Sequence, residues 1–220
     1  MSASAGDPVA VIGLGRFGSS LALELMRRGT EVLAIDHRPK IVQSLSGELT
    51  HVVTADATDI EALRQVGVAE FSRAVVAIGS DLEASILTTS LLVELGIADI
   101  WAKAVSRQHG RILERIGATH IVLPEHDMGE RVAHLVSGRM LDYMEIDSNF
   151  ALVKTRPPHE AVGVALGQSG LRRKYGITIV SVQTPGQEFT YADANTVLQY
   201  GDIIVIAGPV DRVERFTELP

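Results

Sequence analysis

Three glycines near the start of the chain have the spacing of a nucleotide-binding turn. Gly13, Gly15 and Gly18 form a G-x-G-x-x-G pattern directly after the apolar run Val9–Ile12, and a helix is expected to begin over them. In such a turn the first glycine permits the bend, the second leaves room for a pyrophosphate, and the third allows close helix–strand packing. Because the first N–H groups of a helix can bind an anion, the stretch predicts binding of phosphate groups.

An acidic residue at the end of the next strand indicates the class of nucleotide. Asp36 lies eighteen residues beyond Gly18 and ends the apolar run EVLAID, residues 31–36. A carboxylate here can accept hydrogen bonds from both ribose hydroxyls and would repel a 2′-phosphate, so NADP is not expected. The alternative is a βαβ unit with a purely structural role, because the glycine pattern also occurs in other loops.

These residues need a parallel sheet to bring them together. Apolar runs alternate with helical stretches up to residue 139, and glycines follow several of the helices. Strands are expected at 9–12, 31–36, 50–56, 73–79, 99–105 and 119–124, and helices after the glycine turn and at 39–47, 59–66, 82–95, 107–116 and 126–139. The alternation predicts an α/β fold, a Rossmann-type doubly wound parallel sheet with its ligand at the carboxyl ends of the strands.

The pattern of the sequence changes after residue 139. Strands are expected at 143–147, 150–155, 177–182, 188–192 and 201–209, with one helix at 163–176 and a short helix at the end. Two domains are therefore expected. Residues 1–139 would form a nucleotide-binding domain with a connecting helix, and residues 140–220 a smaller α+β domain.

Composition restricts the class of protein. The absence of cysteine from the 220 residues excludes disulfides, thiolate zinc sites and cysteine nucleophiles. A net charge of −7 argues against nucleic acid as a partner, because binding to phosphate backbones needs a basic face. No apolar run approaches the roughly 18 residues of a membrane span, and MSASAGDP lacks the features of a signal peptide. We expect a cytoplasmic globular protein.

The sequence does not supply the catalytic residues of a dehydrogenase. Such an enzyme needs a proton donor beside the nicotinamide, yet no Tyr-x-x-x-Lys pair occurs and the seven histidines are scattered. The phosphate loop G-x-x-x-x-G-K-[ST] of many NTPases is also missing. The nucleotide is therefore expected to act as a signal, with an NAD-dependent oxidoreductase as the alternative function.

Six longer stretches follow one another in an unbroken order along the chain. They are VIGLGRFGSSLALEL, AIDHRPKIVQSL, ADATDIEALRQVGV, AVVAIGSDLEASILTTSLLVELGI, IWAKAVSRQHGRILERIGATHIVLPEHDMG and YGDIIVIAGPVDRVERF. Together they resemble the regulator of K⁺ conductance (RCK) family, in its KtrA/TrkA type of cytosolic regulatory subunit. The resemblance implies a nucleotide-binding RCK domain and a C-terminal ligand-binding RCK domain. It also implies homodimers and an octameric ring at the inner face of the plasma membrane, beneath an integral-membrane K⁺-translocating subunit.

The resemblance assigns a nucleotide site to the carboxyl ends of the expected strands. It implies that ATP or ADP, with NAD(H) as the alternative, is bound by Gly13, Gly15, Arg16, Phe17, Gly18, Asp36, His37, Asp56, Ala57, Ala77, Ile78, Gly79 and Lys103. Arg16 would contact the terminal phosphate of ATP, so that ATP and ADP set different states of the ring. Asp56 and Ala57 would contact the adenine, and Lys103 a phosphate. The alternatives are a solvated Arg16, an Asp56 that closes a turn or caps a helix, and an ordinary strand exit at 77–79.

Two further ligands follow from the resemblance. Glu125 would bind a divalent cation or Na⁺ at a two-fold interface, where a cation relieves the repulsion between two carboxylates. An acid placed to favour a helix dipole is the alternative. The C-terminal domain of the family often binds cyclic di-AMP, for which Arg172, Arg173 and the apolar run 177–182 are candidates, and a solvated basic surface is the alternative. A nucleotide-sensing module of another cation transporter or antiporter also stays open.

Overall fold

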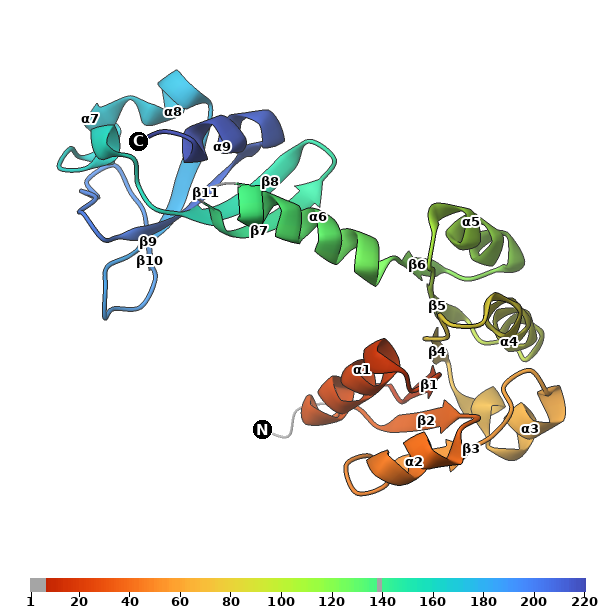
Figure 1. Cartoon of the computed structure of the whole chain (residues 1–220). Helices are drawn as coiled ribbons and strands as arrows, with labels where there is room; N and C mark the ends of the chain where they lie inside the picture. The colour runs from red at the N-terminus through yellow and green to blue at the C-terminus, as the bar shows by residue number, and fades with distance from the viewer. Residues whose placement is uncertain (1–6, 138–139) are drawn as a thin grey trace. The chain divides into compact units, whose positions relative to one another are not determined.

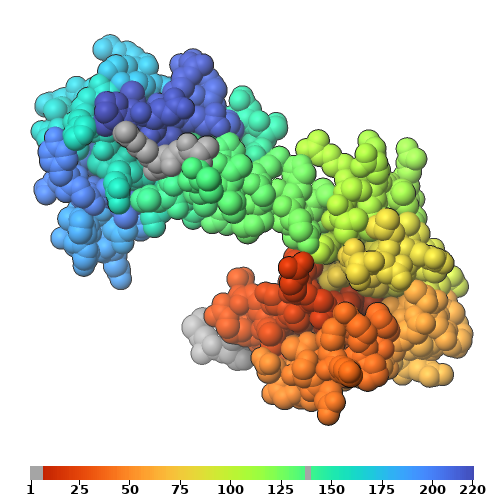
Figure 2. All heavy atoms as spheres, viewed as in Figure 1, coloured from red at the N-terminus to blue at the C-terminus, as the bar shows by residue number. Residues whose placement is uncertain are grey.

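The chain folds into two compact units, Met1–Glu125 and His126–Pro220 (Figure 1). The computed structural model describes residues 7–137 and 140–220. In the space-filling view, the atoms from red to yellow-green form the continuous body of the first unit (Figure 2). Helix α6 (Pro124–Ser137) begins at the end of the first unit, and most of its residues fall in the second. The two units are defined by contacts within this one chain. The predicted domain boundary between residues 139 and 140 therefore stays a prediction.

The first unit is a six-stranded parallel sheet in the order β3-β2-β1-β4-β5-β6. Its strands are β1 (Val9–Ile12), β2 (Val32–Asp36), β3 (His51–Thr54), β4 (Arg73–Val76), β5 (Asp99–Lys103) and β6 (His120–Val122). The helices are α1 (Arg16–Arg27), α2 (Pro39–Leu45), α3 (Ile60–Gln65), α4 (Leu82–Glu94) and α5 (Arg107–Ile116), with a 3₁₀ turn at Val68–Glu70. The predicted Rossmann-type fold is confirmed. The strand order reverses between β1 and β4, where such folds bind ligands.

Both faces of this sheet are buried, as a doubly wound fold requires. Successive side chains of a strand point to opposite faces. Val11 belongs to the same apolar cluster as Ala22 of α1, whereas Ile12 belongs to the cluster of Leu63 from α3 and Leu92 from α4. All five side chains are at most 1% exposed. Helices therefore cover the two faces, and the carboxyl ends of the strands are left to form a site.

The second unit is built on a five-stranded antiparallel sheet in the order β10-β9-β11-β8-β7. Its strands are β7 (Met140–Asp147), β8 (Phe150–Thr155), β9 (Thr178–Gln183), β10 (Thr190–Tyr191) and β11 (Ile203–Pro209). The helices are α6, α7 (Leu166–Ser169), α8 (Leu171–Tyr175) and α9 (Val210–Thr217), with a 3₁₀ turn at His159–Ala161. The predicted smaller α+β domain is confirmed, although β10 is shorter than the strand expected at 188–192.

The prediction of one helix over residues 163–176 is wrong. Gly170 has a φ of +67°, and it is both the C-cap of α7 and the N-cap of α8. A left-handed residue cannot continue an α-helix, and glycine adopts that conformation without a steric penalty. Ala165, which was expected to be helical, instead forms an isolated antiparallel bridge with Val197. Two short helices therefore replace the expected single one.

Candidate functional site

A cavity of about 660 Å³ lies at the carboxyl ends of β1, β2, β4 and β5. The predicted site residues that line it are Gly13, Gly15, Arg16, Phe17, Asp36, His37, Asp56, Ala57, Ala77, Ile78, Gly79, Lys103 and Glu125. The structure thus brings together residues spread over more than a hundred positions of the chain. Gly18 does not line the cavity. The cavity lies at the switch point between β1 and β4, which is the expected ligand position in this fold.

The three glycines of the turn have different surroundings. Gly13 has a φ of +93°, and a Cβ there would lie 3.1 Å from the backbone of Ala77. A Cβ on Gly18 would lie 1.9 Å from the carbonyl oxygen of Gly13, so this glycine serves the packing of α1 against the turn. A Cβ on Gly15 would meet no heavy atom within 4 Å. Gly15 therefore faces open space in the cavity, as expected for the second glycine of such a turn.

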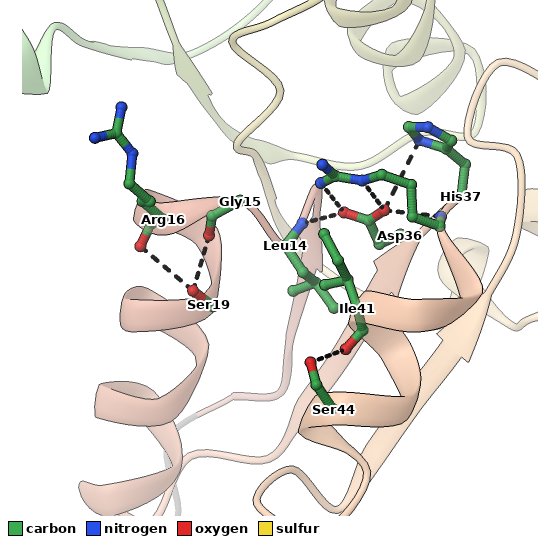
Figure 3. A network of polar contacts seen from close by, with 9 residues as sticks. Leu14, Gly15, Arg16, Ser19, Asp36, His37, Ile41 and Ser44 are labelled. Atoms are coloured by element: carbon green, nitrogen blue, oxygen red, sulfur yellow. Dashed lines mark hydrogen bonds and ion pairs between the residues drawn. The ribbon is translucent and has the colours of Figure 1, made fainter.

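Helix α1 begins without a side-chain cap. Its N-cap is Gly15, and the first turn contains no acidic residue. The backbone N–H groups of this turn are therefore left for an anion. Arg16, the first residue of the helix, is exposed, and its guanidinium points outward from the turn (Figure 3). A cation at this end opposes the helix dipole, so the pairing of Arg16 with a bound anion would relieve an unfavourable local charge.

Asp36 is buried at the end of β2, with its carboxylate in a network of hydrogen bonds (Figure 3). It accepts hydrogen bonds from the backbone N–H of Leu14 at 2.7 Å and from the N–H of Arg38 at 2.9 Å. The Arg38 guanidinium donates twice more, through Nε and Nη2, each at 2.9 Å. Burial by itself would raise the pKa of Asp36, but the hydrogen bonds from Arg38 and Leu14 outweigh it and lower the pKa to about 2.

Arg38 is a residue that the sequence analysis missed. It lines the cavity and forms a two-point contact with the carboxylate predicted to bind ribose. The signal in the sequence was its position two residues after Asp36, close enough for a long side chain to fold back. His37, between them, has a mostly exposed side chain, with Nδ1 3.8 Å from Oδ1 of Asp36. Asp36 has a structural role as well, because its hydrogen bond from the N–H of Leu14 stabilises the glycine turn.

Asp56 closes a turn, as its alternative interpretation held. Its Oδ1 accepts hydrogen bonds from the N–H of Thr58 at 2.9 Å and from Oγ1 of Thr58 at 2.7 Å. These bonds lower the pKa of Asp56, the side-chain bond having the larger effect. The adjacent Ala57 is buried, and its carbonyl oxygen accepts a hydrogen bond from Oγ1 of Thr88 on α4 at 3.1 Å. The turn at Asp56 and Ala57 is thus held against α4 at the edge of the cavity.

Lys103 and Glu125 form an ion pair in the cavity wall. Nζ of Lys103 donates to Oε1 of Glu125 at 2.7 Å, with the lysine side chain 11% exposed and the glutamate side chain 63% exposed. The lysine also lies 5.8 Å from the centroid of the Phe17 ring and against Gly79. The hydrogen bond from Lys103 is the largest cause of a lowered pKa of Glu125. The partner of this buried cation is a carboxylate, where the resemblance implied a phosphate.

The cavity also has walls that the sequence analysis did not name. They are Ile12, Ile35, Ala55, Thr58 and Val105, together with Ser80 and Asp81 just before α4 and Ala84 and Thr88 on it. Asp81 caps α4 by accepting a hydrogen bond from the N–H of Ala84 at 3.0 Å. Ile12, Ile35, Ala55, Ser80 and Val105 lie at or next to the ends of predicted strands, which was the available signal for them.

The part of the chain that the structure describes contains no cluster of metal-ligating side chains and no helix able to span a membrane. Over residues 7–137 and 140–220, no three His, Asp or Glu side chains gather closely enough to hold a metal ion. Within the same ranges, no helix is both long enough and apolar enough to cross a membrane.

Comparison with known proteins decides the family. Residues 9–124 match the TrkA-N domain and residues 150–220 match the TrkA-C domain. The Ktr system potassium uptake protein C of Bacillus subtilis (strain 168) is 39% identical over 208 residues, which cover 94% of each chain. The chain belongs to the RCK family. The Ktr system potassium uptake protein A of Vibrio alginolyticus is 33% identical to this RCK chain over 93% of each chain. The prediction that the chain is not an enzyme is confirmed by this membership.

Solved structures agree with the fold of this RCK chain. The RCK domain of GsuK superimposes with a TM-score of 0.68 over 100% of the chain, at 20% identity. The RCK chain spans 50% of the length of that protein. A structure of GsuK bound to ADP matches 59% of the RCK chain and 34% of its own length, with 26% identity and a TM-score of 0.52. The match over the whole chain shows that this chain shares the fold of the RCK domain of GsuK.

Proposed function

We propose that this RCK chain binds ATP and ADP in the cavity of its first unit and thereby regulates a membrane K⁺-translocating partner. The observation that carries the proposal is the convergence of predicted nucleotide ligands on one cavity of about 660 Å³, a size that suits a small organic ligand. The relatives named as potassium uptake proteins and the GsuK structure described with bound ADP support it. NAD(H) is the alternative ligand of the same cavity, since a GsuK channel structure is described as bound to NAD.

The geometry suggests one direction for the nucleotide. In the proposed pose the ribose lies at Asp36, at the end of β2, and the adenine lies near the turn at Asp56 and Ala57. The phosphates then cross the glycine turn over Gly15 toward the uncapped first turn of α1. Arg16 and Lys103 supply cations at this end of the cavity. A polyphosphate would therefore meet positive charge where its own negative charge is greatest.

Regulation requires that the ligand distinguish two states of the protein. A ligand shifts a conformational equilibrium only through its differential affinity for the two states. ATP and ADP differ by one phosphate, and we propose that Arg16 senses it. We also propose that the chains form homodimers and a ring of eight, because alternating two-fold contacts through both domains can close a ring. In this proposal the ring acts at the cytoplasmic face of the membrane, and ATP and ADP favour different ring shapes.

The proposed cation site at Glu125 needs a second copy of the chain. Glu125 supplies one exposed carboxylate, of which one oxygen is already engaged by Lys103. Hard cations need several oxygen ligands, so two symmetry-related carboxylates would have to meet at a two-fold axis. When bound there, Mg²⁺, Ca²⁺ or Na⁺ would neutralise the charge of these carboxylates.

Cyclic di-AMP remains a proposed ligand of the second unit. Arg172 lines a cavity of about 280 Å³ there, beside the apolar side chains of Leu171, Ile177 and Ile179. A cation next to an apolar wall suits the phosphate and the base of a nucleotide.

Calorimetry and light scattering test the main proposal. The purified full chain should bind ATP and ADP, NADH should compete for the same site, and light scattering should report a dimer or larger ring. Liposomes that contain the membrane partner should then show K⁺ flux that depends on the nucleotide. Absence of binding by all three nucleotides, or a monomer whose mass does not change with concentration, would refute the proposal. No reduction of NAD is expected with candidate alcohols or acids, and such a reaction would contradict the proposed regulatory role.

A further inference from the structure

The carboxylate that we propose to bind the ribose, Asp36, is covered by a side chain of the same protein. Asp36 lines the cavity, yet it is only 3% exposed. An ionised carboxylate has about four acceptor positions, and four donors fill them. They are the backbone N–H of Leu14, the backbone N–H of Arg38, and Nε and Nη2 of the Arg38 guanidinium. A ribose diol therefore finds no free acceptor position on Asp36.

The four donors differ in their freedom to leave. The N–H of Leu14 belongs to the glycine turn, and the N–H of Arg38 belongs to the backbone just after β2, so the backbone holds both in place. The guanidinium stands on a long side chain that is 47% exposed. Its rotation into solvent would release two acceptor positions of Asp36, one on each oxygen. Two is also the number of hydrogen bonds that the 2′- and 3′-hydroxyls of a ribose can donate.

We propose that Arg38 is a displaceable cap on Asp36, which a nucleotide must remove before its ribose diol can bind. This inference rests on the proposed nucleotide-binding function of the cavity. In the empty cavity the cap keeps a buried carboxylate paired, which avoids the cost of an isolated charge. On binding, two hydroxyl donors replace the two guanidinium donors. The observed affinity for any nucleotide with a free diol is then lowered by the fraction of molecules that carry the cap.

The cap sets the nucleotide concentration to which the protein responds. A half-exposed ion pair contributes modestly to stability, but the two-point geometry and the buried carboxylate strengthen this one. Loss of the guanidinium should therefore tighten binding of diol-containing nucleotides by about three- to tenfold. A nucleotide without the diol gains nothing, because it does not compete with Arg38 for the acceptor positions.

The test compares ATP with 2′,3′-dideoxy-ATP by calorimetry on the full chain. Arg38→Met keeps the length of the side chain and both backbone hydrogen bonds to Asp36, and Arg38→Lys keeps the charge without the two-point fork. Arg27→Met is the matched control, because Arg27 makes an equivalent fork with Glu24 on the exposed face of α1. The measured quantity is the ratio of the ATP affinity to the dideoxy-ATP affinity, which cancels general effects of charge on the phosphates.

We expect this ratio to rise about three- to tenfold in Arg38→Met, to rise less in Arg38→Lys, and to stay unchanged in Arg27→Met. In an Asp36→Asn background the effect of Arg38→Met should vanish, because the carboxylate that both groups contact is gone. If Arg38→Met binds ATP but its ratio is unchanged, the cap proposal is overturned and the proposed nucleotide-binding function is not. A lower ratio would show that Arg38 contacts the ribose directly and would also overturn the cap proposal. Absence of ATP binding in the wild-type protein would overturn the proposed function and the cap together.

Discussion

Lys103 and Glu125, joined at 2.7 Å, connect the end of β5 to the first turn of α6. The resemblance assigned the lysine to a phosphate and the glutamate to a cation, but each holds the other in the structure. A bound phosphate that attracts Lys103 would therefore release Glu125, and a cation on Glu125 would release Lys103. The two proposed ligands should strengthen each other's binding, and thermodynamic linkage requires the effect to be equal in both directions.

Glu125→Gln tests this coupling. Without divalent cation, the variant should bind ATP about three- to tenfold more tightly than the wild-type protein, because Lys103 no longer has a carboxylate partner and one negative charge near the phosphates is lost. Added Mg²⁺ or Ca²⁺ should tighten ATP binding in the wild-type protein and much less in the variant. Calorimetry with and without chelator measures both effects. Glu114→Gln, at an exposed position of α5, is the control, and a weaker ATP affinity in Glu125→Gln would contradict the coupling.

Arg16→Ala should abolish most of the preference for ATP over ADP. The guanidinium is exposed at the start of α1. In the proposed pose, Asp36 and Asp56 lie near the ribose and the adenine, which ATP and ADP share. A two-point contact with a phosphate contributes on the order of 1–3 kcal/mol. Titrations of the variant with both nucleotides should show ADP affinity nearly unchanged and ATP affinity reduced toward it. Arg111→Ala, exposed on α5, should change neither affinity, and a full ATP preference in Arg16→Ala would direct attention to Lys103.

Gly15→Ala and Gly18→Ala should separate binding from folding. A methyl group at Gly15 meets no protein atom within 4 Å, so the loss of stability should be about 1 kcal/mol or less. The same methyl group would occupy the space that we propose for the pyrophosphate and should weaken ATP binding about tenfold or more. At Gly18 it would lie 1.9 Å from the carbonyl oxygen of Gly13, which should cost about 3 kcal/mol or more of stability. Thermal melting and calorimetry on both variants measure this, and equal melting temperatures would contradict it.

Asp36→Asn should weaken binding of ATP, ADP and NADH together, by about 1–3 kcal/mol for the loss of the charged ribose acceptor. Asparagine is the sharper change than alanine, because its amide oxygen can still accept the hydrogen bond from the N–H of Leu14 that holds the glycine turn. Asp59→Asn, at the exposed cap of α3, is the control. Unchanged ATP affinity in a folded Asp36→Asn protein would show that the ribose does not lie at the end of β2.

His109 should make the stability of the first unit depend on pH. The side chain is 3% exposed on α5, and burial lowers its pKa below the usual value of 6.5. Below about pH 6.5 the unfolded chain binds a proton there that the folded chain does not. The contribution of His109 is therefore fully present above that pH and is lost as the pH falls, by at most about 1.4 kcal/mol per pH unit. Thermal melting between about pH 7.5 and 5.5 should show a smaller decrease in His109→Asn than in the wild-type protein or in the exposed-site control His51→Asn.

The sequence alone predicted the parts that depend on local pattern. The apolar runs, the glycine turn at Gly13 to Gly18 and the acid at Asp36 specify a βαβ unit, because each needs only residues close together in the chain. The order of elements then determined which residues end a parallel strand, and such ends share one edge of the sheet. This is why nearly all the predicted site residues line one cavity. Gly18 does not line it, because it packs against the carbonyl group of Gly13 and the side chain of Ala77.

Only the tertiary structure decided which side chains of the cavity pair with one another. Arg38 fills the acceptor positions of Asp36, and Lys103 is paired with Glu125, 22 residues further along the chain. Hydrogen bonds of this kind depend on distances of a few tenths of an ångström between side chains, which spacing in the sequence does not specify. The break at Gly170 has the same origin, since a glycine permits both a helical and a left-handed backbone and the surrounding fold selects one. Local sequence pattern thus determines the strands and the residues at their carboxyl ends, whereas the contacts of Asp36 and Lys103 with other side chains arise from the tertiary structure.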